Sequence, residues 1–179
     1  RFLHVSCFHE KAKNIQGMLR AVRKVAEERQ DFELMLVGTG VDYSSDVAYA
    51  HSLNFPEGML TFTGEQTPHE VAQWMQESDC FVLFSRYETY AVVLAEAITK
   101  ALPIISTSTA GIATELPEGC GITIESENED QLVVAIRRML NKQEQFNTES
   151  IKQYSRYFHT QEVGKTLWTI YDRCLHSHI

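Results

Sequence analysis

The sequence predicts an α/β fold in which a doubly wound, mostly parallel six-stranded sheet carries helices on both faces. Three observations support this prediction. Short apolar runs alternate along the chain with segments of helical periodicity, which is typical of parallel strands joined by crossover helices. The runs are apolar throughout, as strands covered on both faces are. The 179 residues, 44% of them hydrophobic, fit one domain with a sizeable core and exclude a disordered chain.

The first half of the chain contains the first three predicted strands. Phe2–Cys7 is expected to be a strand, and Ile15–Glu28 an amphipathic helix because its apolar residues recur at helical spacing. The turn Gly38-Thr39-Gly40 ends the second strand. Thr67-Pro68-His69-Glu70 is a capping box with proline at the first helical position, and it starts a helix that runs to about Glu77. The other elements predicted here are strands at Phe32–Val37 and Met59–Thr63 and a helix at Ser45–Leu53.

The second half continues the same alternation. Ser126-Glu127-Asn128-Glu129 is a second capping box and opens a helix that runs through Leu140. Two further helices are expected after Glu144, with a break near Phe158-His159. Ligands of such sheets bind beyond the carboxyl ends of the strands, at a switch in strand order. The other elements predicted here are strands at Cys80–Phe84, Pro103–Ser106 and Gly121–Ile124 and a helix at Tyr90–Lys100.

Charge and cysteine content exclude several functions. The net charge is −8, the pI is near 5.3 and no basic stripe is present, so we expect no nucleic-acid partner. No apolar run approaches the ~20 residues that span a bilayer, so we expect no direct membrane insertion. The cysteines lack metal-ligand spacing, and no metal site is expected. We interpret them as reduced thiols of a cytoplasmic protein, with Cys7 and Cys80 in core strands and Cys120 and Cys174 elsewhere.

The segment Ser85–Ala97 carries two carboxylates, Glu88 and Glu96. Glu88 lies where a strand is expected to end, and Glu96 lies inside the following helix among apolar residues, where a carboxylate needs a polar partner. The N-terminus of that helix offers free N–H groups and the positive end of its dipole, which suit a diphosphate. Because carboxylates accept hydrogen bonds from sugar hydroxyls, the pair indicates a nucleotide-sugar site. The alternatives are a dipole-complementing residue at Glu88 and a solvated helix face at Glu96.

Lys13 follows the first predicted strand, in the loop His9–Asn14. A lysine at this position can neutralise a leaving diphosphate without a metal. The alternative is a surface lysine before a helix, with Asn14 as the N-cap. Gly38-Thr39-Gly40 lacks the third glycine of a dinucleotide-binding fingerprint, because Tyr43 stands in its place, and we interpret it as a tight turn.

Taken in order, these motifs resemble the C-terminal, donor-binding domain of retaining glycosyltransferases of the GT-B fold, family 4 (group 1). The resemblance covers about residues 2–140 and implies the Rossmann-like half of a GT-B fold. It rests on the first strand with Lys13-Asn14, the turn Val37-Gly38-Thr39-Gly40, the element Phe62-Thr63-Gly64, the signature formed by Ser85, Glu88 and Glu96, the strand Ala101-Leu102-Pro103-Ile104, and the glycine turn ending at Glu115.

The resemblance implies a role for each residue of the site. Glu88 and Lys13 would be catalytic, with Glu88 contacting the donor sugar and Lys13 holding the diphosphate. Glu96 would hold the ribose hydroxyls. The donor would be a nucleoside diphosphate sugar of UDP or GDP, its sugar would be transferred with retention, and no cofactor or metal is implied. The remaining donor-binding residues would be Tyr90 and Ala91, whose backbone meets the diphosphate, and Thr89, Val92, Gly64 and Cys7.

Three positions depart from the family pattern. Cys7 stands where the family often has arginine, and the glycine pair of the later turn is Ala110-Gly111. The family's E-G-x-G turn is here Glu88-Thr89-Tyr90-Ala91, so we expect a backbone that needs no glycine conformation there.

The resemblance also bears on domain organisation. It implies that residues 1–179 form one donor domain and that the N-terminal acceptor domain of such enzymes is absent, so that the chain alone binds donor but transfers little. The acceptor would be a hydroxyl of a glycan or a lipid-linked molecule, bound through the missing domain, and the full-length protein would be cytoplasmic, with the inner membrane face as a candidate site. Two alternatives stay open: a nucleotide-sugar epimerase of the same architecture, and a non-hydrolytic nucleotide-sugar binding module.

Overall fold

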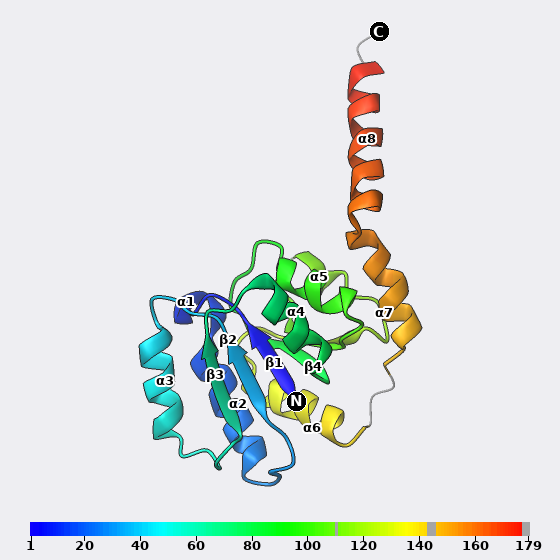
Figure 1. Cartoon of the computed structure of the whole chain (residues 1–179). Helices are drawn as coiled ribbons and strands as arrows, with labels where there is room; N and C mark the ends of the chain where they lie inside the picture. The colour runs from blue at the N-terminus through cyan, green and yellow to red at the C-terminus, as the bar shows by residue number, and fades with distance from the viewer. Residues whose placement is uncertain (110, 143–145, 177–179) are drawn as a thin grey trace.

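A computed structural model describes residues 1–109, 111–142 and 146–176. Ala110 and Glu144 of the sequence analysis lie outside the described residues. The described chain contains a six-stranded sheet in the order β3-β2-β1-β4-β5-β6, and every neighbouring pair is parallel (Figure 1). The predicted doubly wound α/β fold is therefore confirmed. The strands are β1 Phe2–Val5, β2 Leu34–Val37, β3 Leu60–Gly64, β4 Cys80–Leu83, β5 Ile104–Thr107 and β6 Gly121–Ile124.

Helices cover both faces of the sheet. Each face packs with its own helices into a separate apolar core. Successive strand residues point to opposite faces, so Phe2 joins one core and Leu3 the other. The first core is closed by α2 Ile15–Ala26, α3 Tyr43–Ser52 and α6 Glu129–Leu140, and the second by α4 Pro68–Gln76, α5 Val92–Thr99 and α7 Thr148–Ser155.

The strand order reverses between β1 and β4. β1 pairs with β2 along its whole length, from Phe2↔Leu34 to Val5↔Val37. It pairs with β4 only at Phe2↔Cys80 and Leu3↔Phe81, and beyond that point the strands diverge. A crevice at the carboxyl ends of β1 and β4 is the expected ligand site of such a sheet.

The structure corrects two element boundaries near this crevice. β1 ends at Val5, and Cys7 is exposed rather than part of a core strand, because the chain turns away into a one-turn helix, α1 Glu10–Lys13, which the sequence analysis treated as a loop. α5 begins at Val92 rather than Tyr90.

The second capping box is also corrected. α6 begins at Glu129, and its N-cap is Asn128, whose side-chain oxygen accepts the Gln131 N–H. Ser126 lies outside the helix, and its hydroxyl donates to the Ser85 carbonyl at 3.4 Å. The first box, at Thr67, is confirmed: the Glu70 N–H donates to the Thr67 hydroxyl and the Thr67 N–H to the Glu70 carboxylate.

The C-terminal segment has the predicted two helices and break. α7 is followed by the 3₁₀ turn Arg156–Phe158 and then by α8 Thr160–His176. α8 contains no buried residue and extends away from the sheet (Figure 1). Within the described part of the chain, no helix has both the length and the apolar character to cross a membrane.

Candidate functional site

Lys13 and Glu88 meet at the carboxyl edge of the sheet. Lys13 ends α1, just after β1, and Glu88 lies in the loop after β4, so both occupy the carboxyl edge beside the strand-order switch. The Lys13 Nζ and Glu88 Oε1 are 2.6 Å apart, and the side chains are only 16% and 9% exposed. The Ser85 hydroxyl donates to the same Oε1 at 2.6 Å. The added hydrogen bond from Ser85 to Oε1 helps to offset the desolvation cost of so sheltered an ion pair.

Asn14 follows Lys13 and occupies the N-cap position of α2, as the sequence predicted, but it does not cap in the predicted way. Its φ of 52° places it in the left-handed region, and its side chain makes no capping hydrogen bond. The side-chain oxygen instead accepts from Arg86 Nη2 at 2.5 Å. The sharp turn at Asn14 separates α1 from α2 and holds Lys13 at the crevice.

Ala91 corrects the expectation for the loop before α5. It is the N-cap of α5 with a φ of 59° and a ψ of 54°, a left-handed conformation that glycine adopts more readily. The chain therefore keeps the glycine-type backbone without the glycine. No side chain caps α5, so its first N–H groups are available to an anion. Thr89, Tyr90 and Val92 are exposed around this helix end.

Gly111 closes the loop on its other side. Its Cβ, if present, would lie 2.5 Å from the Tyr90 carbonyl oxygen, so this position of the expected glycine turn does require glycine. The Ile112 N–H donates to the same Tyr90 oxygen at 3.3 Å. The turn Gly111–Thr114 thus holds the backbone that precedes α5.

Glu96 is exposed to solvent, so its carboxylate is open to water or to a polar ligand. The apolar residues beside it on α5 face the core, so Glu96 itself lies on the outer side of the helix. Its side chain lines a groove of about 400 Å³ between α4 and α5. The groove is lined by Val5, Gln66, Pro68, Val71, Ala72, Met75, Glu96, Thr99 and Lys100.

Of the remaining predicted residues, Gly64 lies at the end of β3 and Cys7 in the loop after β1. Gly64 ends β3 with a φ of 70°, and its carbonyl accepts the Gly38 N–H at 2.8 Å, which joins the turns after β2 and β3. Cys7 is exposed in the loop after β1. Within the described residues, no three His, Cys, Asp or Glu side chains come together in a group that could hold a metal ion.

His4 is a buried titratable residue that the sequence analysis did not find. Its Nδ1 donates to the Val82 carbonyl at 2.9 Å, and its Nε2 accepts from the Ser6 hydroxyl at 2.7 Å. The pKa of His4 is lowered to about 4, chiefly by burial and also by the nearby Lys13 charge, against the hydrogen bond to Val82 and the Glu88 charge. The imidazole is therefore neutral at pH 7. The sequence signal for a buried His4 is a histidine inside an apolar strand, and such histidines are common.

Comparison with known proteins now adds to the geometry. The family model described as glycosyl transferases group 1 matches residues 1–142. N-acetyl-alpha-D-glucosaminyl L-malate synthase of Bacillus anthracis is 32% identical over 117 residues, which cover 65% of this chain and 29% of that protein. A Campylobacter jejuni 4-alpha-N-acetylgalactosaminyltransferase that acts on a diphospho-undecaprenol-linked sugar is 25% identical over 133 residues, 73% of this chain and 35% of that protein.

Solved structures share the fold over nearly the whole chain. The lipopolysaccharide outer core galactosyltransferase WaaB, in its apo form, has a TM-score of 0.83 at 20% identity and covers 99% of this chain and 49% of its own. The pneumococcal O-GlcNAc transferase GtfA in complex with UDP and GlcNAc has a TM-score of 0.79 at 20% identity and covers 98% and 36%. This chain spans between about a third and a half of each of these proteins.

The strand order, with helices on both faces, matches the Rossmann-like domain of the GT-B fold. The family model covers most of the chain, including β1, Lys13, Glu88 and Glu96. By fold and by sequence, this chain belongs to the group 1 family of glycosyl transferases.

Proposed function

We propose that this chain binds a nucleoside diphosphate sugar and that the full-length protein transfers the sugar, with retention, to a hydroxyl of a glycan or a lipid-linked acceptor. One observation carries the proposal. A sheltered Lys13–Glu88 pair lies at the strand-order switch, and an uncapped helix N-terminus follows Glu88 in the same loop. Cation, carboxylate and free amides are the groups that a diphosphate sugar requires.

The donor would lie along α5. Lys13, the α5 amides and the backbone of Tyr90 and Ala91 would hold the diphosphate. Glu96, farther along the helix, would accept hydrogen bonds from the ribose, and the base would enter the groove that Glu96 lines. UDP is the first nucleotide to test, because one structural relative was solved in complex with UDP. GDP is the second. The residues proposed to complete the donor site are Thr89, Val92, Gly64 and Cys7.

The ion pair suggests how the site works. Without donor, Lys13 and Glu88 neutralise each other. When donor binds, the Lys13 ammonium would turn to the diphosphate, and the freed Glu88 oxygen would accept from a hydroxyl of the donor sugar. As the glycosidic bond breaks, negative charge grows on the diphosphate, and Lys13 and the helix amides stabilise it in place. No metal is needed for this step.

The acceptor would bind elsewhere in the full-length protein. We propose that these residues form the donor domain, that another domain supplies the acceptor site, and that this chain alone therefore transfers little. The exposed apolar side chains of α8 suit contact with such a domain. We also propose a cytoplasmic location, because the four cysteines are free thiols. The family match favours a transferase over an epimerase or a binding module.

A thermal-shift measurement tests donor binding. UDP, GDP, ADP and their sugars are added to the protein and to Glu96→Ala, with Glu27→Ala, an exposed residue at the end of α2, as the matched control. A ligand that binds only the folded state raises stability by RT ln(1 + [L]/Kd). We expect a shift with one nucleotide that is lost in Glu96→Ala and kept in Glu27→Ala.

Transfer is then measured in the full-length protein. With the nucleotide sugar identified by the shift, Glu88→Gln should abolish transfer while the protein stays folded. Transfer by residues 1–179 alone, or a Glu88→Gln protein that is as active as wild type, would reject the proposed mechanism. Formation of the epimeric nucleotide sugar without acceptor would instead identify an epimerase.

A further inference from the structure

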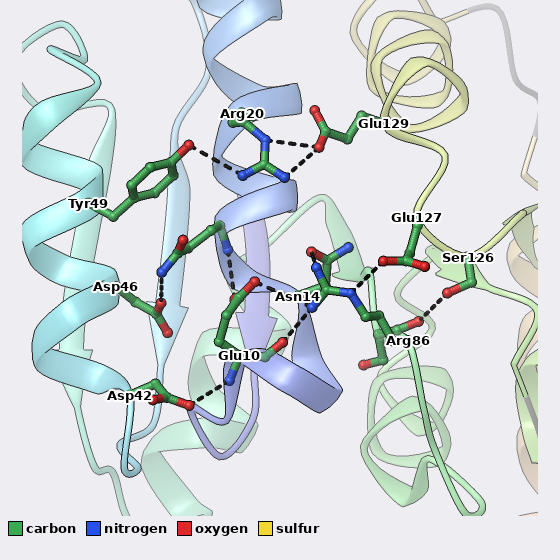
Figure 2. Close-up of polar contacts among 12 residues, drawn as sticks. Glu10, Asn14, Arg20, Asp42, Asp46, Tyr49, Arg86, Ser126, Glu127 and Glu129 are labelled. Carbon is green, nitrogen blue, oxygen red and sulfur yellow. Dashed lines mark hydrogen bonds and ion pairs between the residues drawn. The ribbon is translucent and has the colours of Figure 1, made fainter.

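Arg86 lies at the point where three loops of the carboxyl edge meet (Figure 2). Its Nη1 donates to the Glu10 carbonyl at 2.6 Å, its Nη2 to Asn14 Oδ1 at 2.5 Å, and its Nε to Glu127 Oε1 at 2.7 Å. Its backbone N–H donates to the Ala12 carbonyl at 2.7 Å. Arg86 therefore joins the loops after β1, β4 and β6.

These bonds hold the backbone on both sides of Lys13. The carbonyl of Ala12 and the side chain of Asn14, the two neighbours of Lys13, both accept hydrogen bonds from Arg86. α1 has only four residues, and its last carbonyls lack partners within the helix. So short a helix does not form without tertiary support. Arg86 supplies that support and is separated from Glu88 by a single residue.

Arg86 forms its ion pairs with carboxylates other than Glu88. Its guanidinium donors are taken up by Glu10, Asn14 and Glu127, and the carboxylates of Glu10 and Glu127 balance its charge. Glu127 has a φ of 62°, so the loop before α6 adopts a left-handed residue where this contact is made. Its guanidinium is thus bound to the loops and charge-balanced by two carboxylates, which suits a residue that positions the loops.

We infer that Arg86 is a positioning residue of the donor site: by fixing α1 against the loop that carries Glu88, it sets the place of Lys13 and hence the affinity for the diphosphate. This inference rests on the proposed function. Glu96 lies on α5 and is not held by Arg86. The part of the donor that Glu96 would bind, the nucleoside, should therefore not depend on Arg86.

The test compares two ligands in three variants of the full-length protein. Calorimetry measures the Kd of UDP and of uridine, or of GDP and guanosine if wild type binds GDP. Arg86→Met removes the guanidinium contacts to Glu10, Asn14 and Glu127 and leaves the backbone bond to Ala12 in place. Arg86→Lys retains the charge with fewer donors, and Arg20→Met is the matched control. Arg20 also joins separate helices, through Glu129 and Tyr49, but lies outside the Arg86 contacts (Figure 2).

We expect Arg86→Met to weaken UDP binding about ten-fold or more and uridine binding less than about two-fold, because the lost charge-assisted hydrogen bonds hold the backbone beside Lys13. The Kd of UDP for Arg86→Lys should lie between the values for Arg86→Met and wild type, and both Kd values for Arg20→Met should equal those of wild type. Equal losses for UDP and uridine, or equal effects of Arg86→Met and Arg20→Met, would show a merely structural role and overturn the inference.

Amide hydrogen exchange without ligand separates this inference from the proposed function. The amides of Lys13 and Asn14 donate to His9 and Glu10 within α1. Their exchange should accelerate on the order of ten-fold in Arg86→Met and not in Arg20→Met. If wild type binds no nucleotide, the proposed function fails, and the role in diphosphate affinity fails with it. Unchanged exchange in Arg86→Met rejects the positioning of Lys13 whatever binds.

Discussion

Two buried side chains make the stability of this domain respond to pH in opposite directions. The pKa of His4 is lowered to about 4, chiefly by burial. The contribution of His4 to the free energy of unfolding is therefore complete above pH 6.5, the ordinary pKa, and is lost as pH falls toward 4. The pKa of Asp46 is raised from 3.8 to about 6, again chiefly by burial and against a hydrogen bond from Gln16. Its contribution is complete below pH 3.8 and is lost as pH rises through 6. Across this range the two effects partly cancel.

Replacing Asp46 by asparagine should isolate the pH-dependent contribution of Asp46 to the free energy of unfolding. Asp46 Oδ1 accepts from Gln16, whereas Oδ2 has no hydrogen-bond partner among the described residues. Asp46→Asn mimics the neutral carboxyl, so the variant should match wild type near pH 4 and exceed its free energy of unfolding by about 3 kcal/mol at pH 7. Urea denaturation at pH 4, 5.5 and 7 measures the difference. Asp130→Asn, at an exposed aspartate, is the control, and a difference independent of pH for Asp46→Asn would contradict the assignment.

At the scale of single residues, the sequence predicted the groups with a chemical signature and missed those that depend on distant partners. Lys13 and Glu88 stood out because each follows a strand, and the structure brings them to 2.6 Å. Arg86 and His4 were missed. Arg86 bonds to residues more than 70 positions earlier, and His4 to Val82, so no local pattern contains either interaction.

α5 shows how an element can begin and end on the same unfavourable backbone conformation. Ala91 at its N-cap has a φ of 59°, and Ala101, just beyond its C-cap, has a φ of 57°. The Ala101 N–H donates to the Ile98 carbonyl and the Leu102 N–H to the Ala97 carbonyl, which is the Schellman pattern of a helix end. Glycine usually occupies this position, because alanine in the left-handed region is strained.

Ala101→Gly should therefore stabilise the domain. Relief of the strain exceeds the added entropy of the unfolded chain, and we expect the free energy of unfolding to rise by about 0.5–1 kcal/mol. Ala97→Gly, in the middle of the same helix, should lower it by about 1 kcal/mol. Thermal and urea denaturation of both variants checks the sign, and a stabilising Ala97→Gly or a destabilising Ala101→Gly would refute the argument.

Among the elements, the sequence predicted helix starts well where one capping pattern was present and poorly where two overlapped. Thr67 had no competitor, and its box is confirmed. Before α6, both Ser126 and Asn128 stand three residues ahead of a glutamate or glutamine. The structure uses Asn128, because Glu127 adopts a left-handed conformation and bonds to Arg86, so the helix begins after it.

For the whole molecule, the two C-terminal helices differ in what they contribute. Ile151 of α7 is buried in the core beneath α5, with Tyr154 and Phe158 packed against it. α8 is exposed along its whole length. It presents an apolar surface made of Val163, Leu167, Trp168, Ile170, Tyr171 and Leu175.

Deleting residues 160–179 should change the free energy of unfolding by less than about 0.5 kcal/mol, because no buried contact is lost. Deletion from 148 onward uncovers α5 and should cost at least about 2 kcal/mol. Sedimentation adds a second measurement: the full 179 residues should self-associate with rising concentration through α8, whereas residues 1–159 should stay monomeric. If the apparent masses of the two chains respond to concentration in the same way, α8 does not mediate self-association.

The alternation of strands and helices predicted the class of the molecule but not its strand order. Alternation follows from local periodicity, which the sequence records directly. The order depends on which side of β1 each crossover returns to, and thus on tertiary packing. The place where Lys13 and Glu88 meet, between β1 and β4, therefore became visible only in the structure.

The brief pairing of β1 with β4 divides the sheet into two blocks along a seam. One block is β3-β2-β1 and carries Lys13, and the other is β4-β5-β6 and carries Glu88. Across the seam run a short ladder, the imidazole of His4, the Lys13–Glu88 ion pair, the contacts of Arg86 and the packing of α2 against α6. Any shear between the blocks changes the separation of the two charges. A ligand that binds both Lys13 and Glu88 would link the two blocks, so the same contacts that bind the ligand would also stiffen the sheet.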